Sequence, residues 1–145
     1  MSGIVVGLDG SHNATRALEW AMAEAAIRHA PLTVIMVNSV PASYRTGAAV
    51  TLPGDDDRVA EIRKTAEAAA EEIATKRGNG RPESVTVTAL SGFPAQTLIE
   101  ASKDSDLLVV GTRGGGGFAP LRLGSVSNQV VHHASCPVVV VPSGE

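Results

Sequence analysis

Aromatic residues and cysteine are scarce in this chain of 145 residues, which holds one Trp, one Tyr, two Phe and one Cys. Proteins that hold single-stranded nucleic acid stack its bases on aromatic side chains, so this composition argues against that function. The lone cysteine, Cys136, excludes an intramolecular disulfide and a cysteine metal cluster. A reducing, cytoplasmic location is therefore expected.

Long hydrophobic runs and a strong net charge are also missing. No apolar run approaches the roughly 20 residues that span a bilayer, and residues 1–20 lack the basic stretch and apolar core of an export signal. We therefore expect a soluble protein without a membrane partner. The formal net charge of −3 offers no basic stripe to DNA or RNA. A small anion is compatible with this charge, because local backbone N–H dipoles attract anions.

The residues that are present form a globular mixture, with 43% hydrophobic and 19% charged residues. The length fits one domain over residues 1–145. Apolar runs predict strands at 4–6, 32–37, 85–89, 107–110 and 137–141. Helical spacing of apolar residues, together with start signals, predicts helices over 12–29, from the acidic triplet 55–57 to the glycines at 78–80, from Pro94, and over 125–133. This alternation predicts an α/β fold with a parallel open sheet and helices on both faces.

A glycine-rich stretch, residues 111–128, directly follows the apolar run at 107–110. Glycines let backbone N–H groups converge on a ligand, as they do in phosphate cradles. Gly124 and Ser125 stand just before a predicted helix, whose start would attract an anion, and Ser127 offers a second hydroxyl. A flexible surface loop is the alternative interpretation of such a glycine cluster.

Ligands of open parallel sheets bind beyond the carboxyl ends of the strands. This rule selects the ranges 7–11, 37–40 and 111–117. Asp9 follows the first predicted strand, where its carboxylate suits either hydrogen bonds to a ribose or base, or capping of the next helix; both interpretations stay open. A P-loop and a G-x-G-x-x-G motif are both missing from the sequence.

The spacing Gly111-x2-Gly114-x9-Gly124-Ser125 resembles the ATP-binding signature of the universal stress protein family. The resemblance extends over almost the whole chain, from the opening 4–9 through Gly92-x-Pro94 and 106–111 to the closing 136–141. It implies a Rossmann-like sheet with strand order 3-2-1-4-5 and binding of ATP together with Mg²⁺. The glycine run 114–117 exceeds what the signature requires, and its ordering would lower the affinity.

Carried over residue by residue, the resemblance implies that Asp9 and the backbone of Val37 hold the adenosine end of ATP. Gly10 and Ser11, next to Asp9, belong to the same predicted site. The residues implied for ribose and phosphates are Gly111, Gly114, Gly124, Ser125, Val126 and Ser127. Thr112, Arg113 and Arg122 lie in or beside the loop, and the charge of the arginines suggests phosphate contacts.

Several residues that invite a chemical role have simpler interpretations. The acidic triplet 55–57 is better explained as a helix start than as a metal site. Neighbouring His132 and His133 would point about 100° apart on a helix, and no ligand set accompanies them. Cys136 is expected to pack rather than react, and Trp20 and Met22 to lie in the core or an interface.

Three functions compete at this point: an ATP-binding regulator of the stress response with at most slow hydrolysis, an ATP-dependent enzyme, and an interaction module with a vestigial site. Hydrolysis requires a base, a metal and charge stabilisation, and no efficient catalytic set is visible in the sequence. The last predicted strand, 138–141, would be an apolar sheet edge. The family resemblance implies that this edge forms a homodimer.

Overall fold

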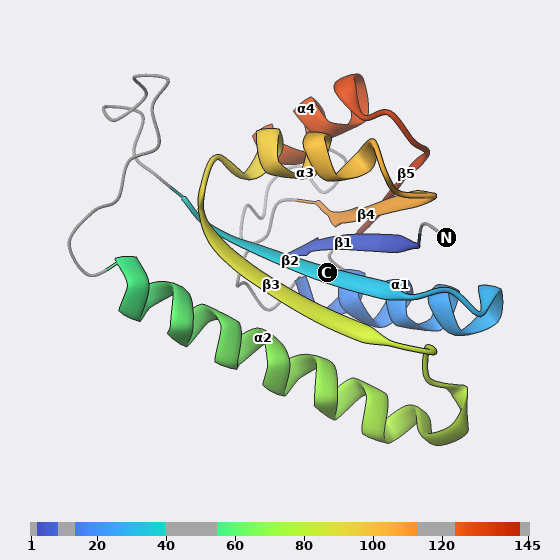
Figure 1. Cartoon of the computed structure of the whole chain (residues 1–145). Helices are drawn as coiled ribbons and strands as arrows, with labels where there is room; N and C mark the ends of the chain where they lie inside the picture. The colour runs from blue at the N-terminus through green and yellow to red at the C-terminus, as the bar shows by residue number, and fades with distance from the viewer. Residues whose placement is uncertain (1–2, 9–13, 40–54, 113–123, 143–145) are drawn as a thin grey trace.

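The computed structural model describes residues 3–8, 14–39, 55–112 and 124–142. Its centre is a parallel sheet of five strands in the order β3-β2-β1-β4-β5 (Figure 1). The strands are β1 (Ile4–Leu8), β2 (Leu32–Ser39), β3 (Val85–Gly92), β4 (Leu107–Gly111) and β5 (Val138–Val141). The predicted α/β architecture and strand order are thus confirmed.

Helices cover both faces of the sheet. Figure 1 shows α1 (Ala14–Arg28) and α2 (Asp55–Arg77) on one face, and α3 (Pro94–Ser102) and α4 (Ser125–His133) on the other. The acidic triplet opens α2 and Pro94 opens α3, as predicted. A single 3-10 turn, η2 (Gly78–Gly80), follows α2. Within the described ranges, no helix is both long and apolar enough to cross a membrane.

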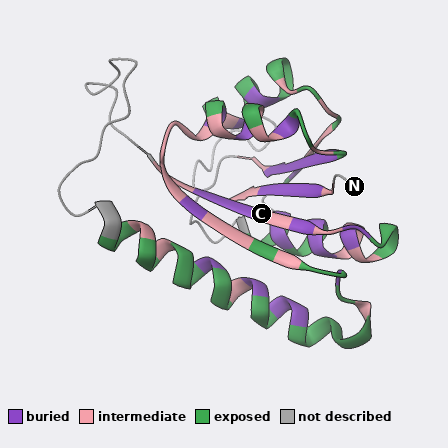
Figure 2. Ribbon diagram, in the orientation of Figure 1, coloured by how far each residue is buried: buried purple, intermediate pink, exposed green. Residues whose placement is uncertain are grey.

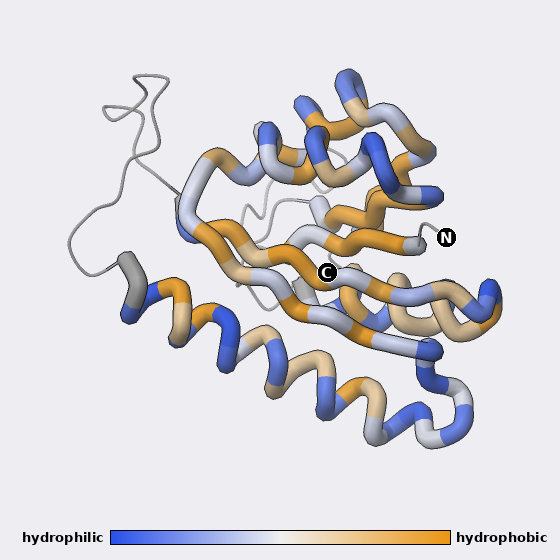
Figure 3. Tube along the Cα trace, viewed as in Figure 1, coloured by the Kyte–Doolittle hydropathy of each residue, from blue (hydrophilic) through white to orange (hydrophobic). Residues whose placement is uncertain are grey.

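Two hydrophobic cores lie on opposite faces of the sheet because successive strand residues point to opposite sides. In β1, Ile4 and Val6 pack in the core beneath α1 and α2, whereas Val5 packs in the core beneath α3 and α4. The central strands are buried along most of their length (Figure 2). Hydropathy follows the same division: the central strands are largely apolar, while α2 carries many hydrophilic residues on its outer side (Figure 3).

The two edge strands differ in length. β5 has four residues, whereas β3 continues to Gly92, three residues beyond the predicted 85–89. The reason is the neighbouring strand: β2 pairs with β3 in parallel along its whole length, so that Asn38 lies opposite Ser91 and Ser39 opposite Gly92. Alternating apolar residues do not extend this far, and tertiary pairing decides where the strand ends.

The end of α1 contains a histidine in a left-handed backbone conformation. His29 has a φ of 54°, and its N–H donates to the Ala26 carbonyl at 3.3 Å. The N–H of Ala30 donates to the Ala25 carbonyl at 2.9 Å. These two hydrogen bonds form a Schellman motif, in which the left-handed position is usually glycine.

We predict that His29→Gly stabilises the protein by about 0.5–1 kcal/mol, because glycine removes the steric cost of a positive φ. The His29 side chain is exposed, so little packing is lost. Urea unfolding measures the change, and His29→Ala is the control, since alanine keeps the Cβ. Equal stability of the two variants would contradict this account.

Candidate functional site

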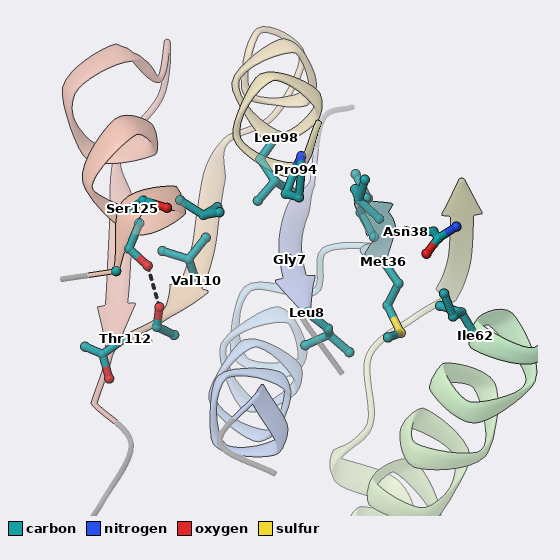
Figure 4. A pocket seen from close by; sticks show the side chains of 16 residues that line it. Gly7, Leu8, Met36, Asn38, Ile62, Pro94, Leu98, Val110, Thr112 and Ser125 are labelled. Carbon is teal, nitrogen blue, oxygen red and sulfur yellow. Dashed lines mark hydrogen bonds between the residues drawn. The ribbon is translucent and has the colours of Figure 1, made fainter. Parts of the chain in front are cut away.

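A cavity of about 480 Å³ lies beyond the carboxyl ends of β1, β2 and β4 (Figure 4). These are the strand ends that the sequence analysis selected. The cavity is lined by Gly7, Leu8, Ile35, Met36, Val37, Asn38, Ile62, Pro94, Leu98, Val110, Gly111, Thr112, Gly124, Ser125, Val126 and Ser127. Six predicted site residues at or next to the end of β4 and the start of α4, together with Val37 from β2, therefore meet at one cavity.

One end of the cavity is formed where β4 stops and α4 starts. Gly124 caps α4 in an extended conformation, with φ −70° and ψ 168°, and Ser125 opens the helix with an exposed side chain. The first intrahelical hydrogen bond runs from the Asn128 N–H to the Gly124 carbonyl at 2.9 Å. N–H groups of the first helical turn have no acceptor within the helix, so this end of the cavity suits an anion.

Ser127 has a structural role that the sequence did not reveal. Its side chain is buried, and its hydroxyl donates to the Gly111 carbonyl at 2.6 Å. This bond joins the first turn of α4 to the last residue of β4. The Ser127 hydroxyl hydrogen is thus used within the protein, whereas the Ser125 side chain extends from the exposed start of the helix.

The other end of the cavity lies at β2 and is mostly apolar. Met36 and Val37 of β2 line it, together with Ile62 from α2 (Figure 4). The polar side chain at this end is Asn38, whose Nδ2 donates to the Ser91 Oγ of β3 at 3.2 Å. A mostly apolar wall with a single polar side chain that can hydrogen-bond to a ligand is typical of small-molecule sites.

Sequence reasoning missed part of the cavity wall. Ile62 and Leu98 line the cavity and were not among the predicted site residues. Leu98 reaches β1 because Gly7 has no side chain: a Cβ on Gly7 would lie 2.6 Å from the Leu98 Cδ1. A glycine in the first strand was the available signal for this close approach.

Several predicted site residues lie outside the described residues, namely Asp9, Gly10, Ser11, Arg113 and Gly114, and also Arg122. Their part in the site stays a prediction. Among the residues that the structure does describe, no group of three or more His, Cys, Asp or Glu side chains could hold a metal ion. His132 and His133 occupy the last turn of α4, and the Nδ1 of His132 lies 2.8 Å from the Asn128 carbonyl oxygen.

Cys136 has the properties of a packing residue. It contacts the core beneath α3 and α4 from a partly buried position. Burial raises the pKa of its thiol, and the negative charge of Asp106 raises it further. Because the thiolate is the reactive form, this environment disfavours a nucleophilic role.

The sheet order 3-2-1-4-5 and the cavity beyond the strand ends define a Rossmann-like α/β protein. The family model described as the universal stress protein family matches residues 1–142, and the chain belongs to this family. A universal stress protein of Mycolicibacterium smegmatis is 35% identical over 142 residues, covering 96% of this chain and 47% of that protein. The chain spans about half the length of the curated relatives it matches.

Two further relatives illustrate the range of similarity. A universal stress protein of Mycobacterium tuberculosis is 34% identical over 148 residues, covering 99% of this chain and 48% of that protein. The solved structure of the universal stress protein from Archaeoglobus fulgidus in complex with dAMP has a TM-score of 0.66 and 26% identity. That comparison covers 97% of this chain and 98% of the other.

Proposed function

We propose that this chain binds an adenine nucleotide in the cavity, with ATP and Mg²⁺ as the ligand, and acts as a nucleotide-dependent regulator of the stress response. The observation that carries the proposal is the difference between the two ends of the cavity. Its β4–α4 end presents a helix start with Ser125, and its β2 end presents an apolar wall with one amide. The complex of the Archaeoglobus relative with dAMP supports an adenine nucleotide.

Slow hydrolysis at most is the second part of the proposal. Phosphoryl transfer needs a group that positions or activates the attacking water, and charges that stabilise the transferred phosphoryl group. The described residues that line the cavity supply hydroxyls, one amide and backbone groups, and none of them carries a charge. This part of the cavity is therefore suited to hold a nucleotide rather than to cleave it.

Isothermal titration with ATP and Mg²⁺ tests the proposal, combined with an assay of phosphate release. We expect saturable heat and slow release of phosphate. Absence of heat would overturn nucleotide binding, and rapid phosphate release would favour an ATP-dependent enzyme. Mass spectrometry of nucleotide released from the denatured protein identifies the ligand carried from the cell.

We further propose a homodimer through the outer edge of β5. The four valines Val138–Val141 form this edge, and three of them are only partly buried. An uncovered apolar edge strand favours pairing with another chain. Light scattering should give twice the mass of the chain, and a monomeric mass would contradict the dimer.

A further inference from the structure

The outer edge of β3 is an open row of backbone hydrogen-bonding groups. The Leu32 N–H of β2 donates to the Ser84 carbonyl at 2.9 Å, and the parallel register runs along the whole of β3. In a parallel ladder, alternate residues of a strand bond to the same neighbour, so every second residue of β3 faces away from β2. These outward residues are Val85, Val87, Ala89 and Ser91. Within the described ranges, their outward N–H and carbonyl groups have no hydrogen-bond partner.

The sequence of β3 does not protect this edge from pairing with another strand. Natural proteins protect open edges with charged residues, proline or bulges. The eight residues of β3 include no charged residue and no proline, and they follow β2 in register without a break. Two copies of such a strand, paired in the antiparallel direction, bring no like charges together. The edge is therefore self-complementary along its whole length.

The flank of α2 beyond β3 carries opposite charges in its two halves. α2 packs beside α1 on one face of the sheet and covers β2 and β3 (Figure 1). It runs antiparallel to the strands within a right-handed crossover, which places Arg63, Glu67 and Glu71 on the flank beyond β3. These three side chains and that of Lys64 are exposed. Arg63, Lys64 and Glu67 form no ion pair with any described residue.

We propose that β3 and α2 form a two-fold interface with a second copy of this chain, in which the two β3 strands pair antiparallel and the sheets join into one. The two-fold axis reverses α2 relative to its copy, so the basic half of its flank, Arg63 and Lys64, faces the acidic half of the other. This interface lies at the opposite edge of the sheet from β5, so it is independent of the dimer proposed above.

The heights of α2 and β3 place the two-fold axis. Ile62 of α2 lines the cavity beyond the carboxyl ends of the strands, and Ile73 belongs to the same core as Val85, at the amino end of β3. The midpoint of this part of α2, near Glu67, is therefore level with Thr88 in the middle of β3. An axis at Thr88 serves the strand pair and the charges of α2 together.

Cross-linking through Thr88→Cys, in a chain that also carries Cys136→Ser, tests the strand pair. At the axis of an antiparallel pair, the two Cα atoms of residue 88 lie about 4.5 Å apart, within the range of a disulfide. Copper phenanthroline should therefore give a covalent dimer on a non-reducing gel. Thr86→Cys is the matched control, because its two copies would lie about 13 Å apart. Absence of the Thr88→Cys dimer, or equal dimer from both variants, would overturn the proposal.

Arg63→Glu tests the contribution of α2, with the rate of Thr88→Cys cross-linking as the measurement. It should slow cross-linking roughly fivefold, because like charges then meet across the interface. Exchanging the charges with Arg63→Glu and Glu67→Arg together should restore the rate. Arg58→Glu is the control: it makes the same change in net charge, and nine residues place Arg58 about 180° from Glu67 on the helix. An unchanged rate for Arg63→Glu would contradict the proposed interface.

Discussion

Replacing Ser125 with glutamate should weaken ATP binding by about 2–3 kcal/mol, or roughly 30- to 150-fold in Kd. Ser125 opens α4 with an exposed side chain at the end of the cavity where we place the phosphates. A carboxylate there would repel the triphosphate. The same carboxylate interacts favourably with the helix macrodipole, so the free energy of unfolding should stay the same or rise slightly. Loss of affinity without loss of stability separates repulsion from misfolding.

Gln129→Glu is the control for this variant. Gln129 is also exposed on α4, and it does not line the cavity. The Gln129→Glu variant adds the same charge to the same helix. Its ATP affinity should remain within about twofold of that of the unchanged protein, because exposed charges away from the ligand are screened. Isothermal titration of the two variants side by side measures the effect. Similar affinities for both would contradict a phosphate position at the start of α4.

Gly3→Ala should lower the free energy of unfolding by about 1–3 kcal/mol, the usual range when a tightly packed position is overfilled. A Cβ at Gly3 would overlap the carbonyl oxygen of Pro31. That oxygen accepts the Ile4 N–H at 3.0 Å, and the Gly3 carbonyl accepts the Asp106 N–H at 2.9 Å. The clash therefore involves backbone that is tied to both neighbouring strands and cannot move aside as a side chain would.

Gly92→Ala is the matched substitution at a roomy position. An added Cβ there meets its nearest atom, the Thr97 Oγ1, at 3.7 Å, which is ordinary van der Waals contact. We expect a change within about 0.5 kcal/mol, or a slight stabilisation from the lower chain entropy of the unfolded state. Urea unfolding of both variants provides the comparison. Equal changes in the free energy of unfolding for the two variants would show that the overlap at Gly3 is relieved by local movement.

Much of the fold could be predicted because local pattern and tertiary structure agree. The run Leu107–Val110 is apolar at every position, and β4 is buried on both faces by helices from each side of the sheet. The acidic start of α2 and the proline start of α3 are chemical signals that act within a single turn. Strand order is not a local property, and it came from the family resemblance.

The cavity was predictable only in part because its walls come from distant segments. Gly111 and Ser125 were identifiable from their glycine spacing. Ile62 contributes to the cavity through the way α2 packs beside β2, which no local pattern encodes. The partner of a serine hydroxyl is equally hidden: Ser127 was expected near phosphates, and its hydrogen is donated to the Gly111 carbonyl.

The bond from Ser127 to Gly111 ties the start of α4 to the end of β4 within the protein itself. If a nucleotide binds at this end as proposed, it need not draw the helix into place. The entropy of ordering α4 is lost once, when the chain folds, and does not recur at each binding event. Under the proposed function, the affinity of this helix start for a nucleotide would depend on its contacts with the ligand rather than on its own rearrangement.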